Sequence, residues 1–245
     1  MVSRATRELI TTAAILWKLD PDVLLAVIAV ESSGKTRVKI NGKAEPLIRF
    51  DGYLFYQRLS GAKLDTAMGG RLASPEPGSV ASPVTQAARW RMLNRAVQID
   101  RKAAYEATFW GIGQVPGAHW SLLGFSSVDA LVKEARSGAD GQLSLMMRYI
   151  EKAGLLEPLR KRDWATFAKG YRPQSEGIRV YRQELALAYR HLGNTGTLKE
   201  AGSKPTTDTR SETAAEPSDN ASLGSFEGLA FLAQRVLRMI SIRRE

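Results

Sequence analysis

The sequence predicts a mainly α-helical fold, a compact bundle of short helices with one small β-hairpin. Apolar residues recur at helical spacing in several separate segments, and turns rich in Gly, Pro and Ser separate those segments. The dipeptide Asn41-Gly42, between short apolar and β-branched residues, is typical of a hairpin turn. At 245 residues the chain is long enough for one substantial domain, or for one domain with an appendage.

The first 83 residues predict two helices, the hairpin and a long loop. A helix is expected over roughly Ser3 to Leu19. Asp20 followed by Pro21 is typical of an N-cap and a first helical position, so a second helix begins there and runs to about Ser32. The hairpin or extended arm lies in RVKINGKAEPLIRF, and Gly69 to Pro83 is expected to be an exposed loop.

Helical spacing resumes after this loop and continues to Leu192. The stretch GIGQVPGAHW, after Trp110, interrupts it with glycines and a proline. The helical segments are TQAARWRMLNRAVQIDRKAAYEATFW, SSVDALVKEARSG, GADGQLSLMMRYIEKAG, RKRDWATFAKGY and EGIRVYRQELALAYRHLG.

The chain changes character after Leu192, which we take as the end of a domain spanning 1–192. Residues 193–224 are polar and rich in Thr, Ser and Pro, and cannot bury enough surface to offset their ordering entropy, so we expect a disordered linker. Residues 225–245 predict a basic amphipathic helix with four arginines in its second half. This helix either contacts an anionic membrane or docks on the domain or on a partner helix.

Composition excludes several classes of site. The chain has no cysteine, which excludes a disulfide framework, a thiolate zinc site and a cysteine nucleophile. His119 and His191 have no metal-ligand spacing, so we expect no metal and no cofactor. The N-terminus resembles neither a signal peptide nor a membrane span.

The net charge is +10, and residues 1–195 carry all of it, with 28 Lys and Arg against 18 Asp and Glu. Such a field attracts polyanions without specifying which.

Glu31 is the first candidate for chemistry. In VLLAVIAVESSGK it follows eight apolar residues, and it shares a helical face with Leu24, Val27 and Ile28. A carboxyl held against apolar side chains has a raised pKa. It can therefore carry the proton that a general acid gives to a leaving sugar oxygen.

Four stretches resemble motifs of a known family. They are AVESSGK (29–35), FDGYLFYQ (50–57), IDRKAAYEATFWGIGQ (99–114) and DWATFAKGY (163–171). Their order resembles the lysozyme-like superfamily, which includes goose-type lysozymes and soluble lytic transglycosylases. More closely, they resemble the N-acetylmuramidase domain of phage endolysins, which reads approximately A-V-E-S-x-G-K, F-E-R-H-x-F-Y-R, I-D-x-x-A-A-L-E-S-x-S-W-G-L-G-Q and D-W-x-x-F-A-R-G-Y-N. The resemblance covers roughly Pro21 to Leu192 and implies a lysozyme-like helical fold.

The resemblance also implies roles for individual residues. Glu31 takes the place of the catalytic acid, and Ser32 follows it in the same motif. The turn containing Gly111, Gly113 and Gln114 is expected to line the substrate cleft, and Tyr171 to lie beside Glu31 and orient it.

The second carboxylate stays open. Asp51 stands where the motif has Glu and is our candidate for a second catalytic role, with Glu106 as the alternative. Departures from the motifs include Asp51-Gly52-Tyr53 in place of E-R-H and Phe109 in place of Ser.

The resemblance implies a glycosidase that cleaves the β-1,4 bond between N-acetylmuramic acid and N-acetylglucosamine in peptidoglycan. An alternative enzyme is a lytic transglycosylase, which forms 1,6-anhydro products. An alternative from another functional class is a non-catalytic phage protein that binds polyanions or membranes. The expected partner is the peptidoglycan glycan strand, with no nucleic acid, and we expect a monomer. We expect synthesis in the bacterial cytoplasm and action on the wall in the periplasm after release.

Overall fold

The computed structural model of the protein describes residues 2–173 and 177–201, with the backbone alone for residues 194–201. Most of the described chain is helical, as predicted. The predicted linker beyond Ala201 and the predicted helix at 225–245 lie outside the described residues.

Most of the helices coincide with the predicted helical segments, whereas those over residues 52–56, 61–69 and 156–160 were not predicted. The helices are α1 (Arg4–Leu16), α2 (Pro21–Ser32), α3 (Gly52–Tyr56), α4 (Gly61–Gly69), α5 (Gln86–Ile99), α6 (Arg101–Glu106), α7 (Val128–Ser137), α8 (Ala139–Lys152), α9 (Leu156–Arg160), α10 (Trp164–Tyr171) and α11 (Ile178–Ala201), with a 3-10 turn at Gly117–His119. The Asp20 side chain caps α2 by accepting a hydrogen bond from the Asp22 amide, and Pro21 occupies the first helical turn, as predicted.

Two small antiparallel sheets accompany the helices. In the first, β1 (Val38–Ile40) pairs with β2 (Lys43–Glu45), and Ile40 lies opposite Lys43, so Asn41 and Gly42 form the predicted hairpin turn. In the second, the strand order is β3 (Ile48–Phe50), β4 (Thr108–Trp110) and β5 (Val115–Pro116). This second sheet was not predicted. It joins segments about sixty residues apart in the sequence.

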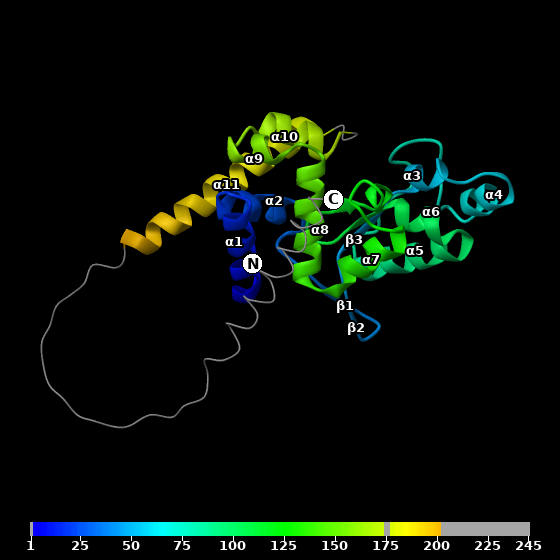
Figure 1. The fold of residues 1–245 in the computed structure, drawn as a ribbon. Helices are drawn as coiled ribbons and strands as arrows, with labels where there is room; N and C mark the ends of the chain where they lie inside the picture. The colour runs from blue at the N-terminus through cyan, green and yellow to red at the C-terminus, as the bar shows by residue number, and fades with distance from the viewer. Residues whose placement is uncertain (1, 174–176, 202–245) are drawn as a thin grey trace, which may run out of the picture. The chain divides into compact units, whose positions relative to one another are not determined.

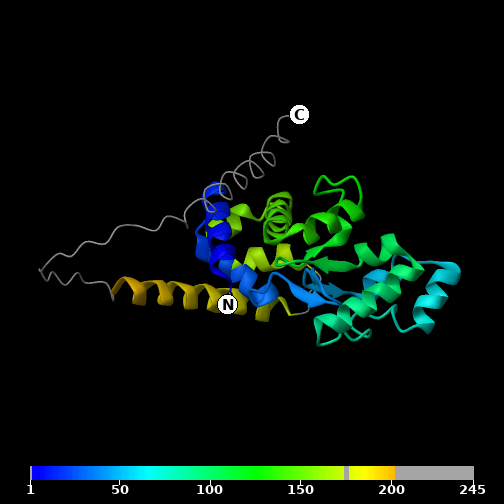
Figure 2. The same cartoon turned by 90° about the horizontal axis from the view of Figure 1, so that it is seen from below.

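Figures 1 and 2 show two groups of elements on either side of α8. Helices α1, α2, α9 and α10 lie on one side, and α3 to α6 lie on the other with the three-stranded sheet between them and α8. Fully buried side chains from both groups form the core; the largest are Trp110, Phe55, Phe167, Ile10, Leu24, Ile28, Ile48, Leu72, Leu93, Ile112, Leu123 and Leu131.

Two tryptophans fix the three-stranded sheet against α5 and α6. The rings of Trp90 on α5 and Trp110 on β4 meet edge to face with centroids 6.0 Å apart. Each indole N–H is satisfied by a backbone carbonyl, that of Pro46 for Trp90 and that of Tyr105 for Trp110. Buried polar groups that are paired in this way stabilise one arrangement of the core. The strand β3 is therefore held in a defined position.

The structure corrects two of the predicted boundaries. The long helical segment from Gln86 to Trp110 breaks at Asp100, which caps α6, and ends as strand β4. Strand pairing with β3 and burial of Trp110 outweigh the local helical pattern there. At the other end, α11 continues past Leu192 to Ala201, so the polar residues just after the predicted domain boundary are helical.

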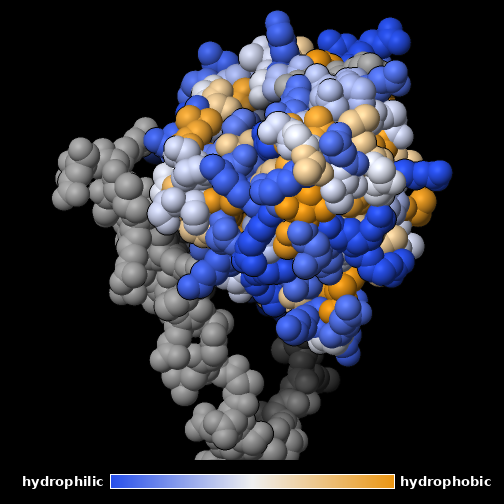
Figure 3. Space-filling model, turned by 90° about the vertical axis from the view of Figure 1, so that its right-hand side faces the viewer, coloured by the Kyte–Doolittle hydropathy of each residue, from blue (hydrophilic) through white to orange (hydrophobic). Residues whose placement is uncertain are grey.

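The surface mixes polar and apolar residues. The face in Figure 3 is mostly hydrophilic, with smaller hydrophobic patches between the charged side chains. Within the described residues, no helix is both long and apolar enough to span a membrane.

Candidate active site

Glu31 lies in the last turn of α2, where the backbone turns sharply away. Ser33 caps the helix with a left-handed backbone (φ 53°), and Gly34 follows with φ 71°. The rest of this face of α2 is core, since Leu24, Val27 and Ile28 are fully buried. The Glu31 side chain has no exposed surface either. The structure therefore places the Glu31 carboxylate at the end of an apolar helix face, as the sequence predicted.

Two side chains from the C-terminal part of the domain enclose the Glu31 carboxylate. Arg172, at the C-terminal end of α10, donates from Nε to Glu31 Oε1 at 3.0 Å and from Nη2 to Oε2, which makes a two-pronged ion pair. Tyr181 on α11 donates its hydroxyl to Oε1 at 2.5 Å. Because the Arg172 side chain is 31% exposed and that of Glu31 is fully buried, Arg172 stands between Glu31 and solvent.

Opposing influences act on the protonation of Glu31. Burial is the largest, and it raises the pKa of the Glu31 carboxyl because the charged form loses hydration. The Arg172 charge and its hydrogen bonds, the Tyr181 hydroxyl and the Arg49 charge all act in the opposite direction. The net direction is upward, as a general acid requires.

Asp51 caps a helix on the other side of the site. It lies between β3 and α3, and its Oδ1 accepts hydrogen bonds from the amides of Tyr53 and Leu54, both at 3.0 Å. Its Oδ2 lies 3.8 Å from Nη1 of Arg49, and 29% of the side chain is exposed. One carboxylate oxygen is therefore committed to the fold, and the other faces a cation and solvent.

Arg49 connects the two carboxylates electrostatically. It lies on β3, and its guanidinium carbon is 3.9 Å from the centre of the Phe109 ring, the residue opposite it on β4. Burial lowers the pKa of Arg49, the charge of Arg172 adds to this effect, and the charges of Asp51 and Glu31 oppose it. Arg49, Asp51 and Glu31 therefore belong to one electrostatic cluster.

The predicted cleft-lining turn, residues 111–114, is instead packed against protein. A Cβ on Gly111 (φ 71°) would lie 2.9 Å from Cγ of Gln142, and one on Gly113 would lie 2.6 Å from Cγ of Met146. Gln114 is only 8% exposed, and its Nε2 donates to the Gly111 carbonyl at 2.8 Å. These glycines therefore make room for the side chains of α8, and the role of the turn in lining the substrate cleft stays a prediction.

Tyr171 and Ser32 also have structural partners. The Tyr171 hydroxyl donates to the carbonyl of Gly113 at 2.6 Å, so the direct orienting contacts to Glu31 come from Arg172 and Tyr181 instead. Ser32 is 5% exposed, and its hydroxyl donates to the Ile28 carbonyl one turn back in the same helix. Both hydroxyls are therefore engaged by backbone carbonyls.

Glu106 has the ion-paired role that is common for a helical glutamate. Its Oε1 accepts a hydrogen bond from the Trp120 indole at 2.9 Å, and its Oε2 lies 3.4 Å from Nε of Arg58. Next to this pair, the ring of His119 stacks on Tyr149, and burial lowers the pKa of the His119 imidazole. These contacts favour Asp51 over Glu106 as the second carboxylate.

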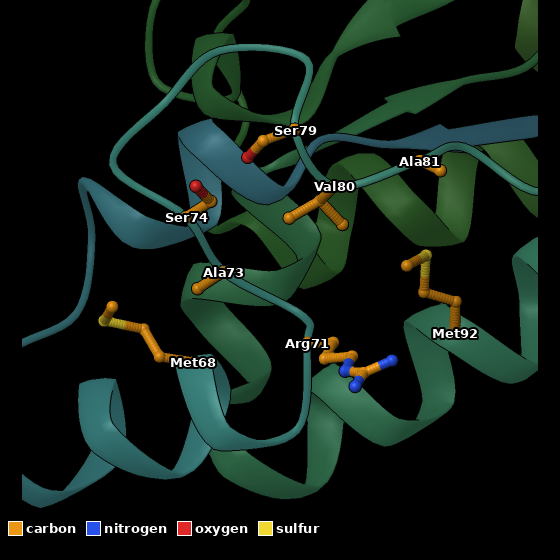
Figure 4. A pocket seen from close by; sticks show the side chains of 8 residues that line it. All are labelled: Met68, Arg71, Ala73, Ser74, Ser79, Val80, Ala81 and Met92. Carbon is orange, nitrogen blue, oxygen red and sulfur yellow. The ribbon is translucent and has the colours of Figure 1, made fainter.

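A cavity of about 430 Å3 lies elsewhere in the domain, between α4, α5 and the loop that joins them. Figure 4 shows its lining, to which α4 contributes Met68, α5 contributes Met92, and the loop contributes Ser79, Val80 and Ala81 among others. None of the predicted site residues contributes to it. Among the described residues, no group of three or more His, Asp and Glu side chains is placed to hold a metal ion.

Sequence reasoning missed the residues that hold the site together. Arg172 directly follows the FAKGY motif, at the position where the family motif has Asn, and this substitution was a signal in the sequence. Gln142 on α8 carried no signal. It is 1% exposed, accepts from the Ile112 amide at 3.1 Å, and donates to the Thr36 carbonyl at 3.0 Å, so it links the turn to the segment after Glu31.

Comparisons with known proteins identify the family of the chain. Residues 20–193 match the muramidase family, described as N-acetylmuramidase. Among solved structures, the chain is similar to the crystal structure of a Burkholderia AP3 phage endolysin, with 27% sequence identity, a TM-score of 0.62, and coverage of 77% of this chain and 71% of that chain. The curated proteins contain no match. Because the matched residues include Glu31, Asp51 and Arg172 and make up most of the chain, the protein belongs to the N-acetylmuramidase family, and it is a lysozyme-like glycosidase acting on peptidoglycan.

Proposed function

We propose that the protein is a muramidase that cleaves the β-1,4 bond between N-acetylmuramic acid and N-acetylglucosamine, with Glu31 as the general acid. The observation that carries this proposal is the fully buried Glu31 carboxyl at the end of α2, whose pKa burial raises. Burial favours the protonated form of this carboxyl, and the leaving sugar oxygen needs that proton.

The first chemical step requires Arg172 to release Glu31. The guanidinium covers both carboxylate oxygens, and a sugar oxygen reaches Glu31 only when at least one of them is uncovered. Arg172 is the exposed partner of the pair, so an incoming glycan strand meets it first. When Arg172 moves away, an influence that opposes protonation is lost, and the pKa of Glu31 rises further.

The second step takes one of three routes. If Asp51 activates a water molecule, its free oxygen takes the proton as the water attacks the anomeric carbon, and the configuration inverts. If Asp51 attacks directly, the configuration is retained. Inversion requires about 6.5 to 9.5 Å between the carboxyls and retention about 5 Å. In the third route the sugar's own 6-hydroxyl attacks, and the product is a 1,6-anhydro sugar, as lytic transglycosylases produce.

The proposed biological role is that of an endolysin. The match to a structure titled as a phage endolysin supports it. We propose that the enzyme is made in the bacterial cytoplasm and reaches the periplasmic face of the wall after membrane lesions form. The basic tail at 225–245 is proposed to contact anionic membrane in this process.

Mass spectrometry of digested peptidoglycan tests the proposed reaction. Purified wall digested to completion is expected to yield muropeptides with reducing N-acetylmuramic acid ends. Reducing N-acetylglucosamine ends would place the cleavage at the other glycosidic bond and contradict the proposal. Products with 1,6-anhydro ends would assign the enzyme to the transglycosylases. Hydrolysis in isotopically labelled water, followed by analysis of the anomer first formed, separates inversion from retention.

A further inference from the structure

We propose that Arg49 is a specificity-determining residue that binds a carboxylate carried by the N-acetylmuramic acid unit of the substrate. This inference rests on the proposed function and extends it to a second part of the substrate. It comes from the electrostatic cluster around Glu31, in which Arg49 differs from the other arginines.

The Arg49 guanidinium is fixed in place without using its hydrogen-bond donors. Stacking on Phe109 at 3.9 Å sets the plane of the guanidinium and leaves its N–H groups at the edge. Its ion-pair partner, Asp51 Oδ2, is 3.8 Å away, which is beyond hydrogen-bonding distance. In the part of the chain that the structure describes, no hydrogen bond from the Arg49 side chain is found. About a third of the side chain is exposed, so a ligand can reach it.

The neighbouring arginines use their donors within the fold. Arg89 donates to the carbonyls of Pro83 and Ile48, and Arg172 donates to Glu31. Arg49 therefore stands apart in this cluster as a guanidinium that is positioned for a ligand.

The charge balance of the site favours an anion in the working enzyme. Arg49 interacts electrostatically with two other arginines, Arg89 and Arg172, and with two carboxylates, Glu31 and Asp51. A general acid works in its protonated form, and protonation of Glu31 leaves three arginines against Asp51 alone. A carboxylate from the substrate restores the balance and accepts charge-assisted hydrogen bonds from a guanidinium.

The substrate supplies such a group close to the bond that is cleaved. The sugar rings of peptidoglycan are neutral, whereas the lactyl group of N-acetylmuramic acid carries a peptide with free carboxylates. Where that peptide has been removed, the lactyl group itself ends in a carboxylate. Both sources present the same chemistry on the same sugar, so N-acetylmuramic acid is recognised by charge as well as by shape.

The test compares substrates that differ only in charge. Soluble glycan strands are prepared with their stem peptides, and a second set is stripped to the lactyl carboxylate by an amidase. Part of each set is then neutralised by converting its carboxylates to amides. The measured quantity is the ratio of kcat/KM on charged strands to kcat/KM on their amidated counterparts.

The wild-type enzyme is expected to prefer at least one charged set by about tenfold to a hundredfold, the range for a hydrogen bond to a charged group. Arg49→Gln is expected to bring that ratio close to one, and Arg49→Lys, which keeps the charge without the planar fork, is expected to restore part of it. Arg91→Gln is the matched control. It removes the same charge from an exposed position two residues from Arg89, on the opposite side of α5, and is expected to keep the wild-type ratio.

The substrate set that shows the preference identifies the source of the carboxylate. A wild-type ratio near one on both sets, or a ratio that Arg49→Gln leaves unchanged, would overturn the assignment of Arg49. Failure of the proposed function looks different, because the wild-type enzyme would then cleave none of the strands or cleave them at the other glycosidic bond.

Discussion

The ion pair between Glu31 and Arg172 opposes the protonation that a general acid needs. Glu31 is fully buried and Arg172 is partly exposed, so the pair opens from the solvent side. The enclosed arrangement therefore keeps the acid unavailable until a glycan strand displaces the arginine.

Replacing Arg172 with Gln is expected to move the basic limb of the pH profile. Burial raises the pKa of Glu31, and among the groups that lower it Arg172 has the largest effect. The pKa of Glu31 is therefore expected to be higher in Arg172→Gln than in the wild type. Activity requires protonated Glu31 and is lost as pH rises through its pKa. The basic limb of kcat/KM against pH should therefore shift to higher pH in Arg172→Gln and stay in place in Arg91→Gln. A shift to lower pH would contradict this account of Glu31.

Asp51 has a structural role and a proposed catalytic one, and two substitutions separate them. Asparagine caps a helix about as well as aspartate, whereas alanine does not. Asp51→Asn should keep the stability of the wild type, and Asp51→Ala should lose about 1 kcal/mol, measured by urea unfolding. If Asp51 acts on the attacking group, both variants lose activity by about a hundredfold or more. Near wild-type kcat in Asp51→Asn would remove Asp51 from the mechanism and favour attack by the sugar's own hydroxyl.

At the scale of elements, the sequence predicted those that depend on local signals. The N-cap at Asp20, the hairpin at Asn41-Gly42 and the helical segments follow from neighbouring residues. The sheet of β3, β4 and β5 was missed because β3 pairs with a segment about sixty residues further along the chain, and because the residues up to Trp110 were interpreted as helical.

In the active site too, the sequence predicted the residue that depends on local signals and missed those that depend on distant contacts. Glu31 was found from the apolar face of its own helix. Arg172, Tyr181 and Gln142 were not, because their partners lie more than a hundred residues away or on other elements. Tyr171 interacts electrostatically with Glu31, as its predicted position beside that residue requires, but the hydrogen bonds to the Glu31 carboxylate come from Arg172 and Tyr181.

A substitution at Gly113 tests the close packing of the 111–114 turn against α8 and α10. A Cβ there would lie 2.6 Å from Cγ of Met146 and 2.9 Å from the Tyr171 hydroxyl. Gly113→Ala is therefore expected to destabilise the domain by about 1 to 3 kcal/mol. Gly69→Ala is the control, because nothing lies within 4 Å of a Cβ at that helical position. Thermal unfolding should show a lower Tm for Gly113→Ala alone, and equal Tm values would contradict the described packing.

At the scale of the whole molecule, the catalytic domain and the basic tail are proposed to have separate tasks. The family match covers residues 20–193, and the tail at 225–245 lies outside it. Four arginines and the apolar spacing of the tail are the sequence features of a helix that lies on an anionic membrane surface.

Deleting residues 225–245 is expected to separate the two tasks. Binding to liposomes that contain anionic lipid should fall, because the arginines and the apolar face of the tail are removed. Digestion of purified peptidoglycan, which contains no membrane, should stay at the wild-type rate. Unchanged liposome binding would exclude the membrane role, and a docked tail that supports the domain would show itself as a lower Tm.

The central claim is that Glu31 gives the proton that breaks the glycosidic bond, and the Glu31→Gln enzyme tests it most directly. Glutamine fits the same space and its carbonyl oxygen still accepts a hydrogen bond from Arg172, but it has no proton to give at working pH. The rate of digestion of purified peptidoglycan is expected to fall by about a hundredfold to ten-thousandfold, while circular dichroism and cooperative unfolding stay those of the wild type. A folded Glu31→Gln enzyme that digests peptidoglycan at close to the wild-type rate would contradict the claim.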